Sequence, residues 1–125
     1  MQIKFSKYQG TGNDFILLNN LSGSYDALSV DDIKLLCNRR FGIGADGLIK
    51  INQSFSKTFE MDYYNSDGSK SFCGNGARCA VAFTETLGIE VSDLTFDAFD
   101  GSHLASKTAN NIKIQMGNVE NVHEF

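Results

Sequence analysis

The sequence predicts an α+β (mixed α/β) fold, in which two helices accompany a larger number of strands. Segments that alternate apolar and polar residues, as strands do, outnumber the segments with helical periodicity. The expected order is strands, helix, strands, helix and then an antiparallel meander, which differs from the regular alternation of a βαβ protein. No internal repeat or low-complexity tract divides the 125 residues, which suit one domain with a modest core.

The amino-terminal half contains two expected strands, a helix and a third strand. The glycine-rich residues 10–14 separate the first two strands. Ser29 is the expected N-cap of the helix, with Asp32 as its capping-box partner, and Gly42 is the expected end. The expected strands are residues 3–8, 15–18 and 48–51.

The second half is expected to contain a strand, a helix and a meander. The helix covers residues 74–87 and stops at Gly88, and a face of small residues lets it sit deep in the domain. The dipeptide Asp100-Gly101 predicts a hairpin between two strands, and Asn110-Asn111 predicts a further turn. The expected strands are residues 59–64, 94–99, 102–108 and 112–116.

Composition excludes several classes of protein. The net charge is −4, from 11 basic and 15 acidic residues, and the basic residues form no stripe, so no nucleic-acid partner is expected. No apolar run is long enough to span a membrane, and residues 1–5 lack the apolar core of a signal peptide. Three cysteines are an odd number for a disulfide framework. A cytoplasmic, reduced protein is the simplest interpretation.

The segment 65–79 carries the strongest chemical signal, because it places Cys73 where a glycine-lined turn enters a helix. The unpaired N–H groups and the helix dipole at such a position favour a thiolate over a thiol. The backbone amides of Gly74, Asn75 and Gly76 are suited to bind a carboxylate. Together these features predict chemistry on a small carboxylic acid, and a buried cysteine ahead of a turn is the alternative.

Other motifs point to structure rather than chemistry. Residues 42–47 match the dinucleotide fingerprint G-x-G-x-x-G, but a helix precedes them and a strand follows, the reverse of what a phosphate loop needs. A glycine-rich connection is the better interpretation. Asp46 is expected to be a turn residue rather than a catalyst, and support of the site is a role that stays open for it. Four potential ligands lack the spacing of a zinc site, so no structural zinc is expected. These ligands are Cys73, Cys79, His103 and His123. Both histidines are expected at the surface.

Two asparagines and two further cysteines complete the candidates. Asn13 and Asn65 each lie in a glycine-rich turn beside an aspartate, where both turn formation and orientation of a polar substrate fit. Cys79 follows Cys73 by six positions, about 9 Å along a helix and about 240° around it, so their sulfurs cannot flank one carbon atom. Cys79 and Cys37 are expected to be small core residues.

Three segments together resemble the diaminopimelate epimerase family. They are Gly10–Phe15, Asn38–Gly47 and Asn65–Cys79, in the family's order and approximate spacing. The resemblance covers nearly the whole chain but only the amino-terminal half of a family member. It implies a mostly antiparallel, curved sheet wrapped around a central helix. Residues 1–117 would be the amino-terminal epimerase domain, and residues 118–125 would start the linker to a second domain.

The resemblance also implies an activity. Family members convert LL- to meso-diaminopimelate without pyridoxal phosphate or metal, as two cysteines exchange protons on opposite faces of one α-carbon. Cys73 would be one of these acid/base groups. Gly74 and Asn75 match the residues that bind the reacting carboxylate, whereas Asn13 and Asn65 match those that hold the substrate's amino-acid groups. The expected partners are a small amino-acid substrate and the missing carboxy-terminal domain, and a homodimer is compatible with the family.

Two features depart from the family pattern. Some relatives carry a side-chain amide where Gly47 stands, and the second cysteine with its own glycine-rich turn is absent from these 125 residues. The isolated chain is therefore expected to be inactive. Two alternatives stay open, namely a related cofactor-independent isomerase of the proline racemase type and a non-catalytic half-protein that binds carboxylates.

Overall fold

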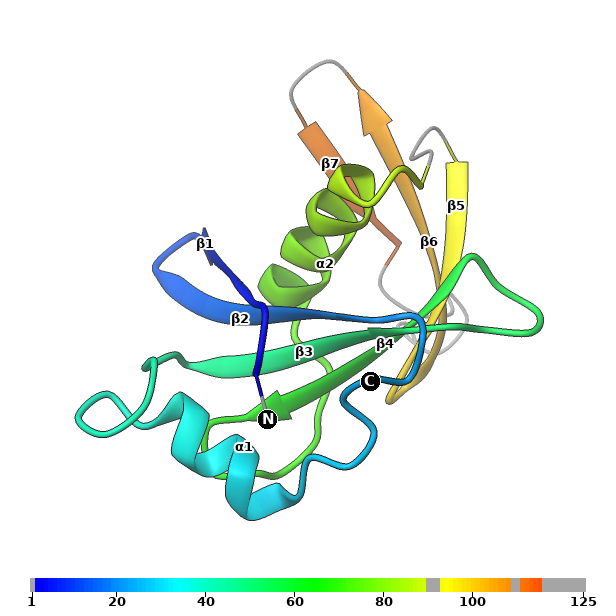
Figure 1. Cartoon of the computed structure of the whole chain (residues 1–125). Coiled ribbons are helices and arrows are strands. Elements are labelled where there is room, and N and C mark those ends of the chain that lie inside the picture. Colours follow the sequence, from blue (N-terminus) through cyan, green and yellow to red (C-terminus); the bar gives the residue numbers. More distant parts are fainter. Residues whose placement is uncertain (1, 90–92, 109–110, 116–125) are drawn as a thin grey trace.

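The computed structural model describes residues 2–89, 93–108 and 111–115. They form one seven-stranded sheet whose strands lie in sequence order, and Figure 1 shows this sheet curling around helix α2. The strands are β1 (Ser6–Gly10), β2 (Asn13–Asn20), β3 (Gly47–Asn52), β4 (Phe59–Asn65), β5 (Asp93–Ala98), β6 (Gly101–Thr108) and β7 (Asn111–Ile114). The helices are α1 (Val30–Cys37), which packs on the face of the sheet opposite α2, and α2 (Gly74–Thr86).

The sheet is mixed but mostly antiparallel, as the resemblance implied. Of the described strand pairs, β2–β3 and β4–β5 are parallel, and the connections between these strands contain α1 and α2. The β4–β5 pair is brief, with Phe59 opposite Phe96 and Glu60 opposite Asp97. In Figure 1, β5, β6 and β7 rise beside α2, whereas β2, β3 and β4 cross below it. The short parallel pair is therefore where the sheet bends around the helix.

Strand β2 separates two hydrophobic cores. Phe15 and Leu17 pack on the α2 side, whereas Ile16 and Leu18 pack on the α1 side, because side chains alternate across a strand. All four side chains are at most 1% exposed. Burial on both faces explains why this strand is a continuous apolar run rather than an alternating pattern.

Helix α1 begins as predicted but ends earlier. Ser29 Oγ accepts from the N–H of Asp32 at 3.1 Å, and Asp32 Oδ2 accepts from the N–H of Ser29 at 3.0 Å. The helix stops at Cys37, since the next residue is extended, so the prediction that Gly42 ends it was wrong. A β-carbon on Gly42 would lie 1.9 Å from Leu35 O. Glycine is needed there because the chain passes against the end of the helix, not because it terminates it.

Helix α2 begins at the predicted residue, ends at Thr86, one residue earlier than predicted, and is followed by the predicted terminal glycine. Gly88 adopts a left-handed φ of +88°, and its N–H donates to Glu85 O at 3.1 Å. The N–H of Ile89 donates to Thr84 O at 3.2 Å, which completes a Schellman motif. The expected face of small residues is fully buried and consists of Ala77, Ala80, Val81 and Thr84. This face lets α2 pack closely against strands β1 to β4.

Many of the predicted strand boundaries shift by one to three residues. Strand β1 begins at Ser6 rather than at Ile3, and the N–H of Lys4 instead donates to the Tyr25 hydroxyl at 2.9 Å. The hairpin between β5 and β6 is confirmed, but its turn residues are Phe99–Asp100, one position earlier than predicted. Hydrogen-bond partners decide where a strand ends, and alternation in the sequence does not reveal those partners.

His103 corrects the prediction that both histidines lie at the surface. It is 3% exposed, and its ring stacks on Phe72 and Phe96 with centroid separations of 4.3 and 5.4 Å. Its ring nitrogens each lie 2.7 Å from an acceptor, one from Gln115 O and the other from Asp100 Oδ1. The inward register of β6 therefore buries it. Predicted residues outside the described part of the chain include Asn110, Met116 and His123.

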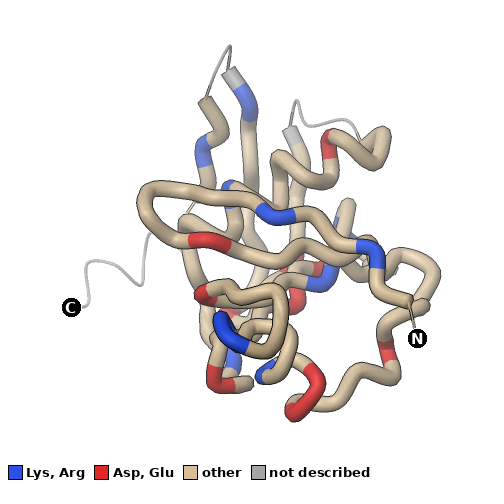
Figure 2. The backbone as a smooth tube through the Cα atoms, turned by 60° about the vertical axis from the view of Figure 1, so that its left-hand side comes forward, with Lys and Arg blue, Asp and Glu red and all other residues tan. Residues whose placement is uncertain are grey.

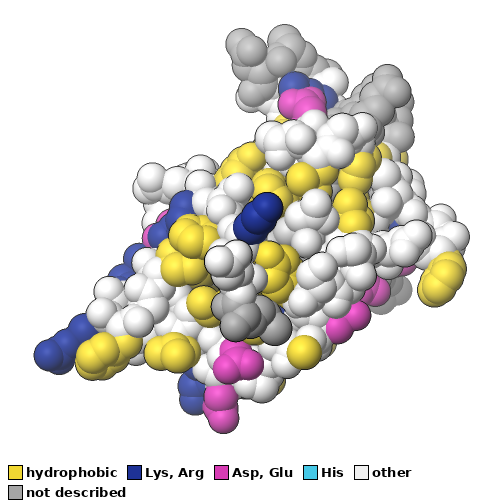
Figure 3. Space-filling view, in the orientation of Figure 1, with side chains coloured by type: hydrophobic (Ala, Val, Ile, Leu, Met, Phe, Trp, Pro, Cys, Tyr) yellow, Lys and Arg dark blue, Asp and Glu magenta, His cyan; other side chains and the backbone are white. Residues whose placement is uncertain are grey.

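The described surface mixes both signs of charge. Figure 2 shows lysines and arginines interspersed with aspartates and glutamates along the backbone. On the face drawn in Figure 3, the hydrophobic side chains form several groups, with other side chains and backbone between them. Among the helices of the described residues, none is long and apolar enough to cross a membrane.

Candidate functional site

Cys73 caps the amino-terminal end of α2. Its backbone is extended, with φ −127° and ψ 114°, and its Sγ accepts from the N–H of Gly76 at 3.4 Å. The side chain is partly exposed, whereas Cys37 and Cys79 are buried as predicted. Burial raises the pKa of Cys37 to about 11 and also raises the pKa of Cys79. Of the three thiols, Cys73 is the one whose position suits proton transfer.

Two backbone amides beside Cys73 lack a protein acceptor. Within the described part of the chain, the N–H groups of Gly74 and Asn75 donate to no protein atom, as is usual in the first turn of a helix. The N–H of Gly76, which was predicted to join them, is instead engaged by the Cys73 sulfur. An added β-carbon on Gly76 would lie 3.3 Å from Ile49 Cδ1, so this glycine also serves packing. An oxyanion would meet two N–H groups and the positive end of the helix dipole.

Asn13 and Asn75, separated by 62 residues in sequence, contact each other. Asn75 Nδ2 donates to Asn13 Oδ1 at 2.9 Å. The other end of each amide is also held, because Asn13 Nδ2 donates to Asp46 Oδ2 at 3.2 Å and Arg78 donates to Asn75 Oδ1. These bonds tie the start of β2 to the start of α2, so two predicted substrate-binding residues share one site.

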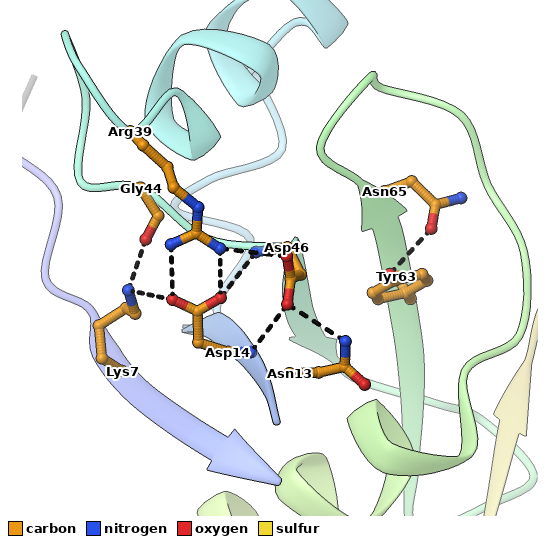
Figure 4. Close-up of polar contacts among 8 residues, drawn as sticks. All are labelled: Lys7, Asn13, Asp14, Arg39, Gly44, Asp46, Tyr63 and Asn65. Carbon is orange, nitrogen blue, oxygen red and sulfur yellow. Dashed lines mark hydrogen bonds and ion pairs between the residues drawn. The ribbon is translucent and has the colours of Figure 1, made fainter. Parts of the chain in front are cut away.

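Asp46 belongs to a charged cluster, drawn in Figure 4, that the sequence did not reveal. Arg39 donates to the two oxygens of Asp14 at 2.8 and 3.0 Å and to Asp46 Oδ1 at 3.1 Å. Lys7 donates to Asp14 Oδ2 at 3.0 Å and to Gly44 O. The Arg39 guanidinium holds the pKa of Asp14 well below its usual range. Asp46 therefore holds Asn13 in place as well as forming a turn, in line with the supporting role that the sequence left open.

Asn65 ends β4, and its amide is engaged within its own loop. The Tyr63 hydroxyl donates to Asn65 Oδ1 at 2.8 Å, and Asn65 Nδ2 lies 3.1 Å from both Ser69 Oγ and Ser71 Oγ. No hydrogen bond between described residues joins Asn65 to the other predicted site residues. The structure thus brings Asn13 and Asn75 together at the start of α2. Figure 4 shows Asn65 beside Tyr63 and apart from Asn13 and Asp46.

The sequence as a whole matches a known family. The family model described as "Diaminopimelate epimerase" matches residues 5–122. The chain belongs to the diaminopimelate epimerase family. Proteins named diaminopimelate epimerase from Flavobacterium psychrophilum and Prochlorococcus marinus are 50% and 46% identical to it. These matches cover 98% and 94% of this chain but 49% and 44% of those proteins, so the chain spans about half the length of the curated relatives it matches.

A solved structure shares the fold of this diaminopimelate epimerase family member. The crystal structure of the Bacillus anthracis phenazine biosynthesis protein, PhzF family, matches with a TM-score of 0.65. The match covers 90% of this chain and 38% of that chain at 15% sequence identity. At this identity the likeness concerns the fold alone, and it confirms the predicted α+β class.

Proposed function

We propose that the chain is the amino-terminal domain of an enzyme that epimerises LL-diaminopimelate to meso-diaminopimelate. The observation that carries this proposal is Cys73, a partly exposed thiol beside the acceptor-free amides of Gly74 and Asn75, in a member of this family. Residues 1–117 would form the domain, and residues 118–125 would begin the linker to a second domain. The share of its relatives that the chain spans supports this division.

The proposed chemistry is a proton transfer in two steps. The Cys73 thiolate takes the α-proton of the substrate, so that an S–H bond forms and the C–H electron pair stays on the carbon. A thiol from the second domain then gives its proton to that pair on the opposite face. One thiolate becomes a thiol and the other thiol becomes a thiolate, and the balance needs no electron acceptor. Configuration at the α-carbon is inverted.

The substrate carboxylate next to the α-carbon is the group that Gly74 and Asn75 would stabilise. Negative charge develops on its oxygens as the proton leaves, and fixed N–H donors act on it most strongly where water is excluded. Removing one such donor from an oxyanion site typically lowers kcat by roughly 10²- to 10³-fold. The two amides and the helix dipole therefore supply the electrostatic part of the mechanism.

Asn13 and Asn65 are proposed to receive the substrate's amino-acid groups. Each Oδ1 accepts one protein hydrogen bond, from Asn75 and Tyr63 respectively, and a carbonyl oxygen has a second lone pair. A substrate ammonium group can donate to that lone pair. Because the NH₂ group of each side chain is held by the protein, its carbonyl is oriented before the substrate arrives.

Replacement of Cys73 tests the proposal in the full-length protein. Cys73→Ala is expected to abolish conversion of LL- to meso-diaminopimelate, because the reacting thiol is lost. Chromatographic separation of the two isomers measures the conversion. Cys37→Ala is the matched control, since it removes a thiol buried between α1 and the sheet, and it should remain active. Near-normal turnover by Cys73→Ala would refute the assignment.

A second candidate is a non-catalytic domain that binds carboxylates. The acceptor-free amides of Gly74 and Asn75 favour it, since they can hold a carboxylate without a partner thiol. Titration calorimetry and deuterium incorporation from D₂O distinguish the two candidates. Binding of diaminopimelate without α-proton exchange, even after a complementing second half is added, would favour the binding domain. A substrate panel that compares diaminopimelate with proline tests the remaining alternative of a proline racemase type.

A further inference from the structure

The hydroxyl of Tyr63 is a buried polar group that the proposed mechanism does not yet use. Tyr63 lies on β4 opposite Ile49 of β3, and its side chain belongs to the core under α2. The residue is 6% exposed, and its ring packs edge-on against Phe15 with a centroid separation of 6.1 Å. From this position its hydroxyl reaches Asn65 Oδ1 at 2.8 Å, as Figure 4 shows.

Gly47 leaves the space that the Tyr63 ring occupies. A β-carbon on Gly47 would lie 2.5 Å from Tyr63 Cε1 and 2.8 Å from its hydroxyl oxygen. Gly47 pairs with Asn65 across β3 and β4, so the phenol fills the volume directly beside Asn65 where a side chain at position 47 would otherwise begin. The glycine is therefore required for this packing and not for a turn.

Both ends of the Asn65 amide are held by the protein. The Tyr63 hydroxyl donates to Oδ1, while Nδ2 donates to the backbone carbonyl of Ser69 at 3.2 Å and also faces the hydroxyls of Ser69 and Ser71. Burial, with a smaller contribution from nearby Cys73, raises the pKa of Tyr63 to about 12. The hydroxyl therefore keeps its proton at neutral pH and remains a donor. Loss of this donor would remove the Tyr63 hydrogen bond to the Asn65 carbonyl, while the Ser69 carbonyl would still hold the NH₂ group.

We propose that Tyr63 is a positioning residue, which fixes the carbonyl of Asn65 toward the substrate through the space left by Gly47. The inference rests on the proposed function, because it concerns the substrate contact assigned to Asn65. Tyr63 acts through Asn65 and does not itself touch the reacting atoms. Its effect is therefore expected on substrate binding more than on the chemical step.

Tyr63→Phe in the full-length protein tests this role, because it removes one oxygen atom and keeps the ring. KM for diaminopimelate is expected to rise roughly three- to tenfold, the effect of one hydrogen bond, while kcat changes by less than about threefold. Tyr64→Phe is the matched control, since the Tyr64 hydroxyl donates to Asp62 Oδ2 at 3.2 Å and not to Asn65. The KM of this variant should equal that of the parent. Equal KM values in the two variants would overturn the proposal. So would a lower kcat at unchanged KM, which signals loss of folded enzyme.

A second measurement separates this inference from the proposed function. In ¹⁵N NMR spectra of the 125-residue chain, the Asn65 side-chain NH₂ signals are expected to shift in Tyr63→Phe and not in Tyr64→Phe. Unchanged Asn65 signals in Tyr63→Phe would overturn the positioning role. A parent protein that neither binds nor epimerises diaminopimelate, but shows the expected NMR difference, would refute the proposed function and leave the Tyr63–Asn65 coupling intact.

Discussion

At the residue scale, the three cysteines carry the same thiol but differ in their surroundings. The Cys73 sulfur accepts from the N–H of Gly76, three residues further along the chain, and leaves the N–H groups of Gly74 and Asn75 for a ligand. Cys79 points elsewhere and packs against Gly10, where an added β-carbon would lie 3.2 Å from its sulfur. Cys37 is buried on the opposite side of the sheet. Access to solvent, rather than the residue type, singles out Cys73.

Alkylation kinetics should follow this difference in access. Iodoacetamide at about pH 7.5 is expected to modify Cys73 first, with Cys37 and Cys79 at least about tenfold slower. For Cys37, a pKa of about 11 leaves a thiolate fraction on the order of 10⁻⁴ at that pH. Mass spectrometry of proteolytic peptides measures the order, and Cys73→Ser should lose the fast site. Faster modification of Cys37 than of Cys73 would contradict the expectation.

Neighbours in the chain made part of the site predictable. Cys73, Gly74 and Asn75 share one turn, so the glycine spacing was enough to indicate them. The contacts of Asn13 with Asn75 and Asp46 were not predictable, because they depend on how distant loops meet. Side-chain hydrogen bonds between such loops leave no periodic pattern in the sequence, unlike a helix face or a strand.

At the scale of elements, the ends of the two helices show which boundaries can be predicted from neighbouring residues alone. The capping box at Ser29 and the left-handed glycine at Gly88 were predicted correctly, because each satisfies backbone groups of its own helix. Gly42 was assigned wrongly, since a close approach to Leu35 also demands glycine, and the sequence does not distinguish the two causes. The parallel strand pairs were equally hidden, because alternation identifies strands and not their partners.

Gly88→Ala tests the contribution of the α2 terminus. The free energy of unfolding of the variant is expected to be about 1 kcal/mol lower than that of the parent, because an L-residue with a β-carbon is strained at a φ of +88°. Among described residues, nothing lies within 4 Å of the added β-carbon, so the cost is conformational. Gly88→Asn is the matched comparison and should lose less, since asparagine tolerates this region. Urea unfolding, monitored by circular dichroism, measures the stability of both variants. A Gly88→Ala variant as stable as the parent would disprove the role of Gly88 as the left-handed end of α2.

At the scale of the whole molecule, the charged cluster fastens segments that are distant in sequence. Lys7 on β1, Asp14 on β2 and Arg39 after α1 meet beside Asp46 (Figure 4). The Arg39–Asp14 pair has two parallel hydrogen bonds, the geometry in which arginine binds a carboxylate best. Because Asp46 also holds Asn13, the cluster connects the stability of the domain to the geometry of the site.

Acid should weaken this connection. The folded-state pKa of Asp14 lies below the ordinary value of 3.8, so its contribution to stability is complete above about pH 4 and is lost as the pH falls through the folded-state value. Asp14→Asn should be less stable than the parent at pH 7 and lose less stability between pH 4 and pH 2 in urea titrations. Asp32 and Asp67, whose pKa values are also lowered, will leave a residual slope. Asp31→Asn, on the exposed side of α1, is the control, and identical slopes in the two variants would contradict the assignment.

The strands of the sheet stand in the order in which the chain supplies them. During translation, which adds roughly 5–20 residues per second from the amino terminus, each new strand therefore meets a partner that has already been made. The sheet can grow at one edge as the polypeptide leaves the ribosome, without an early strand waiting for a late one. The longest intervals between successive strands come before β3 and β5, because the segments that contain α1 and α2 must be synthesised first.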